Sequence, residues 1–155
     1  MATTYAKILV PLDGSKLAAA ALAPARALAE QFGAELILFR VAPNVQQNIE
    51  FTVERKVKDW GGQHQARLVD EAGEALDLIR AELKIHGIEA HGVMAVGDPA
   101  EKIVDYVLDN DVDLVVMSTH GRTGLARWTY GSVARKVLDA VPCSIFLVRN
   151  AAGAE

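Results

Sequence analysis

Short apolar segments alternate with segments of helical periodicity along the whole chain, and this alternation narrows the choice of fold more than any other feature. Strands are expected at residues 5–12, 34–42, 88–96, 112–118 and 143–149. Helical segments lie between them, and a strand, a helix and a further strand form the repeating unit of a parallel sheet. The sequence therefore predicts an α/β fold, a doubly wound, five-stranded parallel sheet with helices on both faces.

Residues that cap helices indicate several of the boundaries. Ser15 suits the N-cap of the first helix and Gly33 its C-terminal end, while Pro24 inside that helix predicts a bend or a lost hydrogen bond. Residues 43–62 show no clean period, and we expect a long connection there with some helix in it. In the segment GDPAEKIVDYVLDN, Asp98 suits the N-cap of a later helix.

The bulk composition is that of one globular domain. The chain has 155 residues, 51% of them hydrophobic, and its net charge of −4 argues against nucleic acid as a partner. Its single cysteine, Cys143, cannot form an internal disulfide, which fits a reducing compartment. No apolar run reaches the length of a membrane span or resembles the core of a signal peptide. We therefore expect a cytoplasmic protein with one domain over residues 1–150 and a short tail at residues 151–155.

The loop MSTHGRTGLARWTYGS, residues 117–132, is the strongest candidate for a binding site. Its glycines let the backbone approach a ligand, and the next helix begins near Gly131 and Ser132 with N–H donors and the positive end of its dipole. Residues 114–150 hold five lysines and arginines against one aspartate, which favours an anion. Asp13 follows the first strand and lies at the same rim, where ligands of doubly wound sheets bind. A carboxylate that accepts from ribose or base, together with a donor-rich loop, indicates a nucleotide.

Simpler interpretations compete with these assignments. Glycine-rich loops between strands and helices are common, so this loop alone does not establish phosphate binding. Asp13 could serve simply as a cap of the first helix, and His120 could be an ordinary loop residue bonded to backbone, without a role in binding. Cys143 precedes a strand with no sign of a base beside it, so we expect it to pack rather than to act as a nucleophile.

Several classes of site are excluded because their signatures are missing. The chain has no GxxxxGK[ST] sequence of a P-loop and no GxGxxG after its first strand. It also has no CxxC or HxxxH spacing, which makes a structural zinc site improbable. A receiver-type phosphorylation domain would need an acidic residue at the end of the third strand and a lysine at the end of the fifth. The chain has MAVG and FLVRN at these places.

Motifs along nearly the whole chain resemble the universal stress protein family, in its single-domain UspA type. The segments ILVPLDGS, GDPAEKIVDYV, DLVVMSTHGRTGL, GSVARKVL and VPCSIFLVR follow one another in the family's order. ATP-binding members carry G-x-x-G, nine further residues and then G-[S/T]. Gly121, the nine residues after it and Gly131–Ser132 match this pattern, but its first glycine falls on Ser118. A serine fails there only if the position needs a positive φ or no side chain at all.

The resemblance implies a Rossmann-like sheet with the strand order 3-2-1-4-5 and an ATP site, with any Mg²⁺ carried mainly by the phosphates. Adenosine would lie beside Asp13 and Val41, and the phosphates at the helix that starts near Gly131. From its position, we expect Arg122 to reach the outer phosphates. The expected ATP-binding residues are Pro11, Leu12, Asp13, Val41, Met117, Ser118, His120, Gly121, Arg122, Gly131, Ser132 and Val133.

The resemblance also implies a function, that of a cytoplasmic, dimeric regulatory or sensing module in the stress response, acting on a regulated protein partner. In the implied strand order the last strand is an edge, and its apolar residues predict a homodimer through Ser144–Arg149. Two alternatives remain open. One is a dimeric interaction protein of the same fold without nucleotide, and the other is a nucleotide-using enzyme such as a slow ATPase, with residues 43–62 as its lid. His120 is the one nearby candidate for a base that could activate water.

Overall fold

Five parallel strands form a single sheet in the order β3-β2-β1-β4-β5, as predicted. The computed structural model describes residues 4–45, 56–120 and 130–149, with the backbone alone for residues 56–61. The strands are β1 (Lys7–Leu12), β2 (Glu35–Ala42), β3 (Ala90–Val96), β4 (Leu114–Ser118) and β5 (Ser144–Val148). The helices are α1 (Lys16–Ala19), α2 (Leu22–Phe32), α3 (Lys56–Ile85), α4 (Pro99–Asp109) and α5 (Ser132–Ala140).

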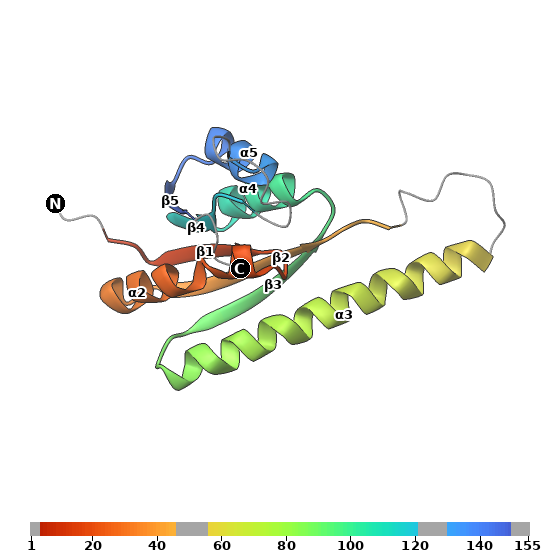
Figure 1. Ribbon diagram of the computed structural model, residues 1–155, viewed down its shortest axis with the longest axis horizontal. Coiled ribbons are helices and arrows are strands. Elements are labelled where there is room, and N and C mark those ends of the chain that lie inside the picture. Colours follow the sequence, from red (N-terminus) through yellow and green to blue (C-terminus); the bar gives the residue numbers. More distant parts are fainter. Residues whose placement is uncertain (1–3, 46–55, 121–129, 150–155) are drawn as a thin grey trace.

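Helices cover both faces of the sheet, with α4 and α5 over one face and α2 and α3 over the other (Figure 1). Successive side chains of a strand point to opposite faces. In β2, Leu36 and Leu38 pack in one cluster with residues of α2 and α3, whereas Ile37 and Phe39 pack in a second cluster with residues of α4 and α5. The predicted doubly wound α/β fold is therefore confirmed, with one apolar cluster on each side of the sheet.

The segment between Ser15 and Gly33, predicted as one helix, is two helices. The Ser15 hydroxyl caps α1 by accepting from the Ala18 N–H at 3.1 Å, and Gly33 ends α2 in the left-handed region with a φ of 65°. Pro24 does not bend a continuous helix, because the interruption comes before it, at residues 20–21. It lies in the first turn of α2, where a proline is tolerated because N–H groups there have no acceptor within the helix.

The longest of the described helices begins inside residues 43–62, where the sequence predicts a long connection with some helix in it. α3 starts at Lys56 and has 30 residues, so its amino-terminal part extends beyond the sheet (Figure 1). Leu76 and Leu83, in its carboxyl-terminal half, join the apolar cluster on the sheet. Residues 46–55 of the predicted connection lie outside the described part of the chain. Among the described helices, none combines the length and the apolar character needed to cross a membrane.

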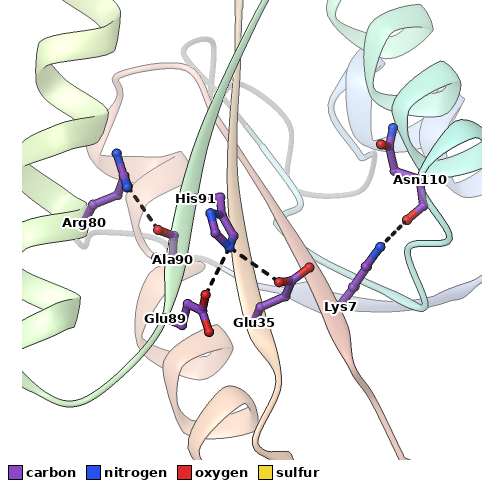
Figure 2. A network of polar contacts seen from close by, with 7 residues as sticks. All are labelled: Lys7, Glu35, Arg80, Glu89, Ala90, His91 and Asn110. Atoms are coloured by element: carbon purple, nitrogen blue, oxygen red, sulfur yellow. Dashed lines mark hydrogen bonds and ion pairs between the residues drawn. The ribbon is translucent and has the colours of Figure 1, made fainter.

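The two edges of the sheet differ in chemistry. At the β3 edge, Arg80 Nε donates to the Ala90 carbonyl at 3.0 Å, and His91 Nε2 lies 3.4 Å from Glu35 Oε2 (Figure 2). Charged side chains of this kind protect a strand edge from pairing with another chain. The β5 edge is apolar instead, and Phe146 on it is 43% exposed.

Replacing the N-cap of α4 should destabilise the protein measurably. The Asp98 carboxylate accepts from the Glu101 N–H at 3.0 Å, so Asp98→Ala should lower the free energy of unfolding by about 1 kcal/mol in urea denaturation. Asp105→Ala, at an exposed position within the same helix, is the matched control and should be neutral or slightly stabilising, because alanine is the better helix former. Equal losses in both variants would contradict the capping role of Asp98.

Candidate functional site

A cavity of about 470 Å³ lies at the carboxyl-terminal rim of the sheet. β1 and β4 are neighbours there, and the chain continues from β1 into α1 and from β4 toward α5. These helices belong to opposite faces, so the rim opens between them, which is where doubly wound sheets bind ligands. Ten of the twelve residues expected to bind ATP line this one cavity, namely Pro11, Leu12, Asp13, Val41, Met117, Ser118, His120, Gly131, Ser132 and Val133. The other two, Gly121 and Arg122, lie outside the described residues.

The turn after β1 brings a carboxylate to the cavity wall. Asp13 Oδ1 accepts from the Ser15 N–H at 2.8 Å, and Gly14 between them adopts a φ of +84°. The N-cap of α1 is Ser15, so the simpler interpretation of Asp13 as the helix cap is wrong. The Asp13 side chain braces the turn two residues ahead of it, as aspartates do in Asx turns, and it lines the cavity as well.

The start of α5 forms the opposite wall. The Gly131 N–H donates to the Thr119 carbonyl at 2.7 Å, which joins this helix start to the end of β4. Ser132, Val133 and Ala134 follow as the first residues of α5 and line the cavity. N–H groups in the first turn of a helix have no acceptor within the helix, and the helix dipole adds positive potential there. Glycine at the N-cap has no side chain that could cover these donors, so this wall suits an anion.

Thr119 and His120 lie between the two walls. Thr119 is only 4% exposed, and its Oγ1 lies 3.1 Å from His120 Nδ1. This contact orients the imidazole, so the simpler interpretation of His120 as a residue bonded only to backbone does not describe it. Both residues line the cavity.

Ser118 occupies the position where the family's ATP-binding pattern has its first glycine, and its backbone shows whether a glycine is required there. Among the described residues, Asp111 is the one non-glycine residue with a positive φ, so the position of Ser118 needs no glycine for its backbone. The Ser118 side chain is buried, and its hydroxyl donates to the Leu17 carbonyl of α1. The serine therefore ties the end of β4 to the first helix while it lines the cavity.

Cys143 has the environment of a packing residue, as the sequence predicts. It packs with the apolar cluster of α4 and α5, and burial raises the pKa of its thiol, which lowers the fraction of reactive thiolate at neutral pH. It is also absent from the cavity lining. Within the described ranges, no three histidine, cysteine, aspartate or glutamate side chains gather in a group that could hold a metal ion.

Several lining residues were not found from the sequence. Gly97 follows β3 at the same rim, and the rule that parallel strands end together could have indicated it. Arg40 immediately precedes the predicted Val41, but its side chain lies on the other face of β2, so strand alternation gave no reason to include it. Leu68 and Ala72 come from α3, whose approach to the rim is a tertiary contact.

A second cavity, of about 570 Å³, lies between the carboxyl-terminal end of α3 and the start of β3, the end of this strand away from the rim. Its Arg80 is engaged within the protein, since it bonds to Asp77 at 3.0 Å and to the Ala90 carbonyl (Figure 2). This open, charged surface does not bring donors together around a ligand as the rim cavity does.

The geometry defines a doubly wound α/β domain with a cavity of about 470 Å³ at the carboxyl ends of its strands. The chain matches the universal stress protein family model over residues 4–149. The universal stress protein MJ0531 of Methanocaldococcus jannaschii is 33% identical over 147 residues, which cover 94% of this chain and 83% of that protein. The chain therefore belongs to the universal stress protein family.

Solved structures show the same fold. The hypothetical protein MJ0577, from the same archaeon, superposes with a TM-score of 0.85 at 28% identity, over 97% of this chain and 100% of that one. The universal stress protein of Archaeoglobus fulgidus in complex with dAMP superposes with a TM-score of 0.64 at 20% identity, over 94% and 98% of the two chains.

Removing the Ser118 hydroxyl should loosen the contact between β4 and α1. We expect Ser118→Ala to lower the free energy of unfolding by about 1 kcal/mol, the typical contribution of one buried hydrogen bond. Ser144→Ala, at an exposed position in β5, is the control and should change it by much less. Urea denaturation followed by circular dichroism measures both, and an unchanged Ser118→Ala variant would mean that the bond to Leu17 contributes nothing.

Proposed function

We propose that the protein binds ATP in the rim cavity and acts as a cytoplasmic, dimeric regulatory or sensing module of the stress response. One observation carries the proposal, namely that the carboxylate-bearing turn of Asp13 and the start of α5 line the same cavity of about 470 Å³. This volume lies within the range of small-molecule sites. Membership of the universal stress protein family supports the stress-response part.

The two walls fit the two ends of a nucleotide. Asp13 offers an acceptor to hydroxyl or amino groups of adenosine, with Val41 beside it. The N–H groups of Ser132 and Val133 offer donors to the phosphates, as helix N-termini commonly do. Bound ATP would bring its own divalent cation on the phosphates, and we propose that Arg122 contacts the outer ones. His120 is the nearest candidate base, and we propose that hydrolysis, where it occurs, is slow.

The choice of ligands to test follows from the relatives. The Archaeoglobus fulgidus structure was solved in complex with dAMP. At its level of identity the likeness to this chain is one of fold, so it suggests which ligands to try rather than what this chain binds. AMP therefore belongs beside ATP in the assay.

ATP should copurify with the protein or bind to it on titration. Heat denaturation followed by chromatography identifies retained nucleotide, and calorimetry measures ATP and AMP binding to the stripped protein. Gly131→Val should weaken ATP binding roughly tenfold or more, because the side chain crowds the phosphate donors. Gly73→Val is the control, since an added Cβ at Gly73 meets nothing within 4 Å, and it should bind ATP normally.

The outcomes separate the three functions that the sequence leaves open. No retained nucleotide and no binding at millimolar ATP would contradict the proposal and favour the dimeric interaction protein. Several turnovers per minute would favour the ATPase. Binding without turnover, lost in Gly131→Val, supports the regulatory module.

We propose that the dimer forms through β5, over Ser144–Arg149. Ile145 and Leu147 pack inward on the cluster beneath α4 and α5, whereas Phe146 lies on the opposite face of the strand and is 43% exposed. An apolar edge strand of this kind is normally covered, and pairing with its twin about a two-fold axis would cover it.

A charge at Phe146 should therefore give monomers. Phe146→Glu introduces the charge on the open face and leaves the inward-facing residues in place, so the fold should persist. Leu78→Glu is the matched control, because Leu78 is also an exposed apolar residue, 75% accessible, but on α3. Sedimentation velocity should show a monomer for Phe146→Glu alone, and a dimer in both variants would exclude the β5 interface.

A further inference from the structure

Arg40 is a cation in the wall of the rim cavity to which the proposed ATP site gives no role. It lies near the end of β2, opposite Leu12 of β1 in the sheet register, and is half-buried. Because Leu36 and Leu38 of the same strand pack toward α2 and α3, alternation directs Arg40 to that face. Ala18 of α1 and Leu68 of α3 line the cavity on this side.

The guanidinium lies directly against the turn that carries Asp13. A Cβ added at Gly14 would be 2.9 Å from Arg40 Nη2 and 3.2 Å from Arg40 Cζ, so the guanidinium packs against the backbone of this turn. Gly14 also has a φ of +84°, which favours glycine in its own right. The positive φ is thus the reason for a glycine at this position, and the guanidinium lies against the turn that the glycine forms.

The donors of Arg40 have no protein acceptor in the part of the chain that the structure describes. Arg26 and Arg80, by contrast, are paired locally, with Glu30 at 3.1 Å and with Asp77 at 3.0 Å. A guanidinium carries five N–H donors in a planar fork and no acceptor. In a cavity wall such a group is available to a ligand.

The position of Arg40 in the sheet determines which part of a bound nucleotide its side chain can contact. The phosphate donors belong to α5, which packs on the opposite face of the sheet, beside β4. Arg40 comes from β2, with β1 between it and β4, and touches the Asp13 turn. An acceptor on Asp13 and donors on Arg40 therefore lie next to each other at the nucleoside end of the cavity.

We propose that Arg40 is a nucleoside-binding residue, whose guanidinium donates to acceptor atoms of adenine beside the Asp13 carboxylate. This inference rests on the proposed ATP site and adds to it the residue that recognises the base. Adenine presents its amino group next to ring nitrogens that accept, and neighbouring acceptor and donor side chains match that pattern.

The test compares ligands that share the nucleoside and differ in phosphate number. Calorimetry with adenosine, AMP, ADP, ATP and tripolyphosphate is performed on the wild type, Arg40→Met and Arg40→Lys. Arg40→Met should weaken all four adenine ligands by the same factor, about tenfold, and leave tripolyphosphate unchanged. Arg40→Lys should recover little, because lysine keeps the charge but lacks the planar fork. Arg26→Met is the control for the loss of one positive charge and should bind like the wild type.

Each result has a separate meaning. A loss that grows from adenosine to ATP, or that appears with tripolyphosphate, would assign Arg40 to the phosphates and overturn the proposal. Normal binding by a folded Arg40→Met variant, as judged by circular dichroism, would overturn it too while leaving the ATP site intact. A wild type that binds none of the ligands would refute the ATP site itself, and the role of Arg40 with it.

Discussion

Because β1 pairs in parallel with β2 on one side and with β4 on the other, all three strands end at the same rim. The chain then leaves β1 toward one face of the sheet and β4 toward the other, and the crevice between these two paths follows from the topology alone. The strands that create it are the most buried part of the molecule, since Ile8, Leu9, Val10, Val115 and Val116 are inaccessible to solvent. The cavity is thus built on rigid elements, while the residues that line it come from the ends of those elements.

Three short contacts hold the walls of the crevice in place. Asp13 braces the turn into α1, Ser118 bonds to Leu17, and Gly131 bonds to the Thr119 carbonyl. Each contact joins the end of a strand to the start of a helix, so the distance between the two walls is set before a ligand arrives. Such preorganisation reduces the entropy lost on binding. Ser118, the residue that departs from the family's glycine pattern, supplies one of these three contacts.

Features with local causes could be predicted well from the sequence. Ser15, Gly33 and Asp98 were expected at helix ends, and they are found there because capping depends on a residue and its nearest neighbours. One local expectation was wrong, because Pro24 lies in the first turn of a separate helix instead of bending a continuous one. The helix expected within residues 43–62 is present, since α3 starts at Lys56 although no clean period is visible there. A long surface helix can form without a strong apolar pattern when only part of it packs on the sheet.

The sequence by itself determined the strand and helix order, and its resemblance to the universal stress protein family indicated the site residues, ten of which line one cavity. Only the tertiary structure decided how those residues are used. Where the Ser118 hydroxyl points depends on Leu17, and what lies against Gly14 depends on Arg40, both distant in the chain. The placement of Arg40 is the plainest case, because it follows from the contact of β2 with the turn after β1. No periodicity in a single segment encodes such a contact between segments.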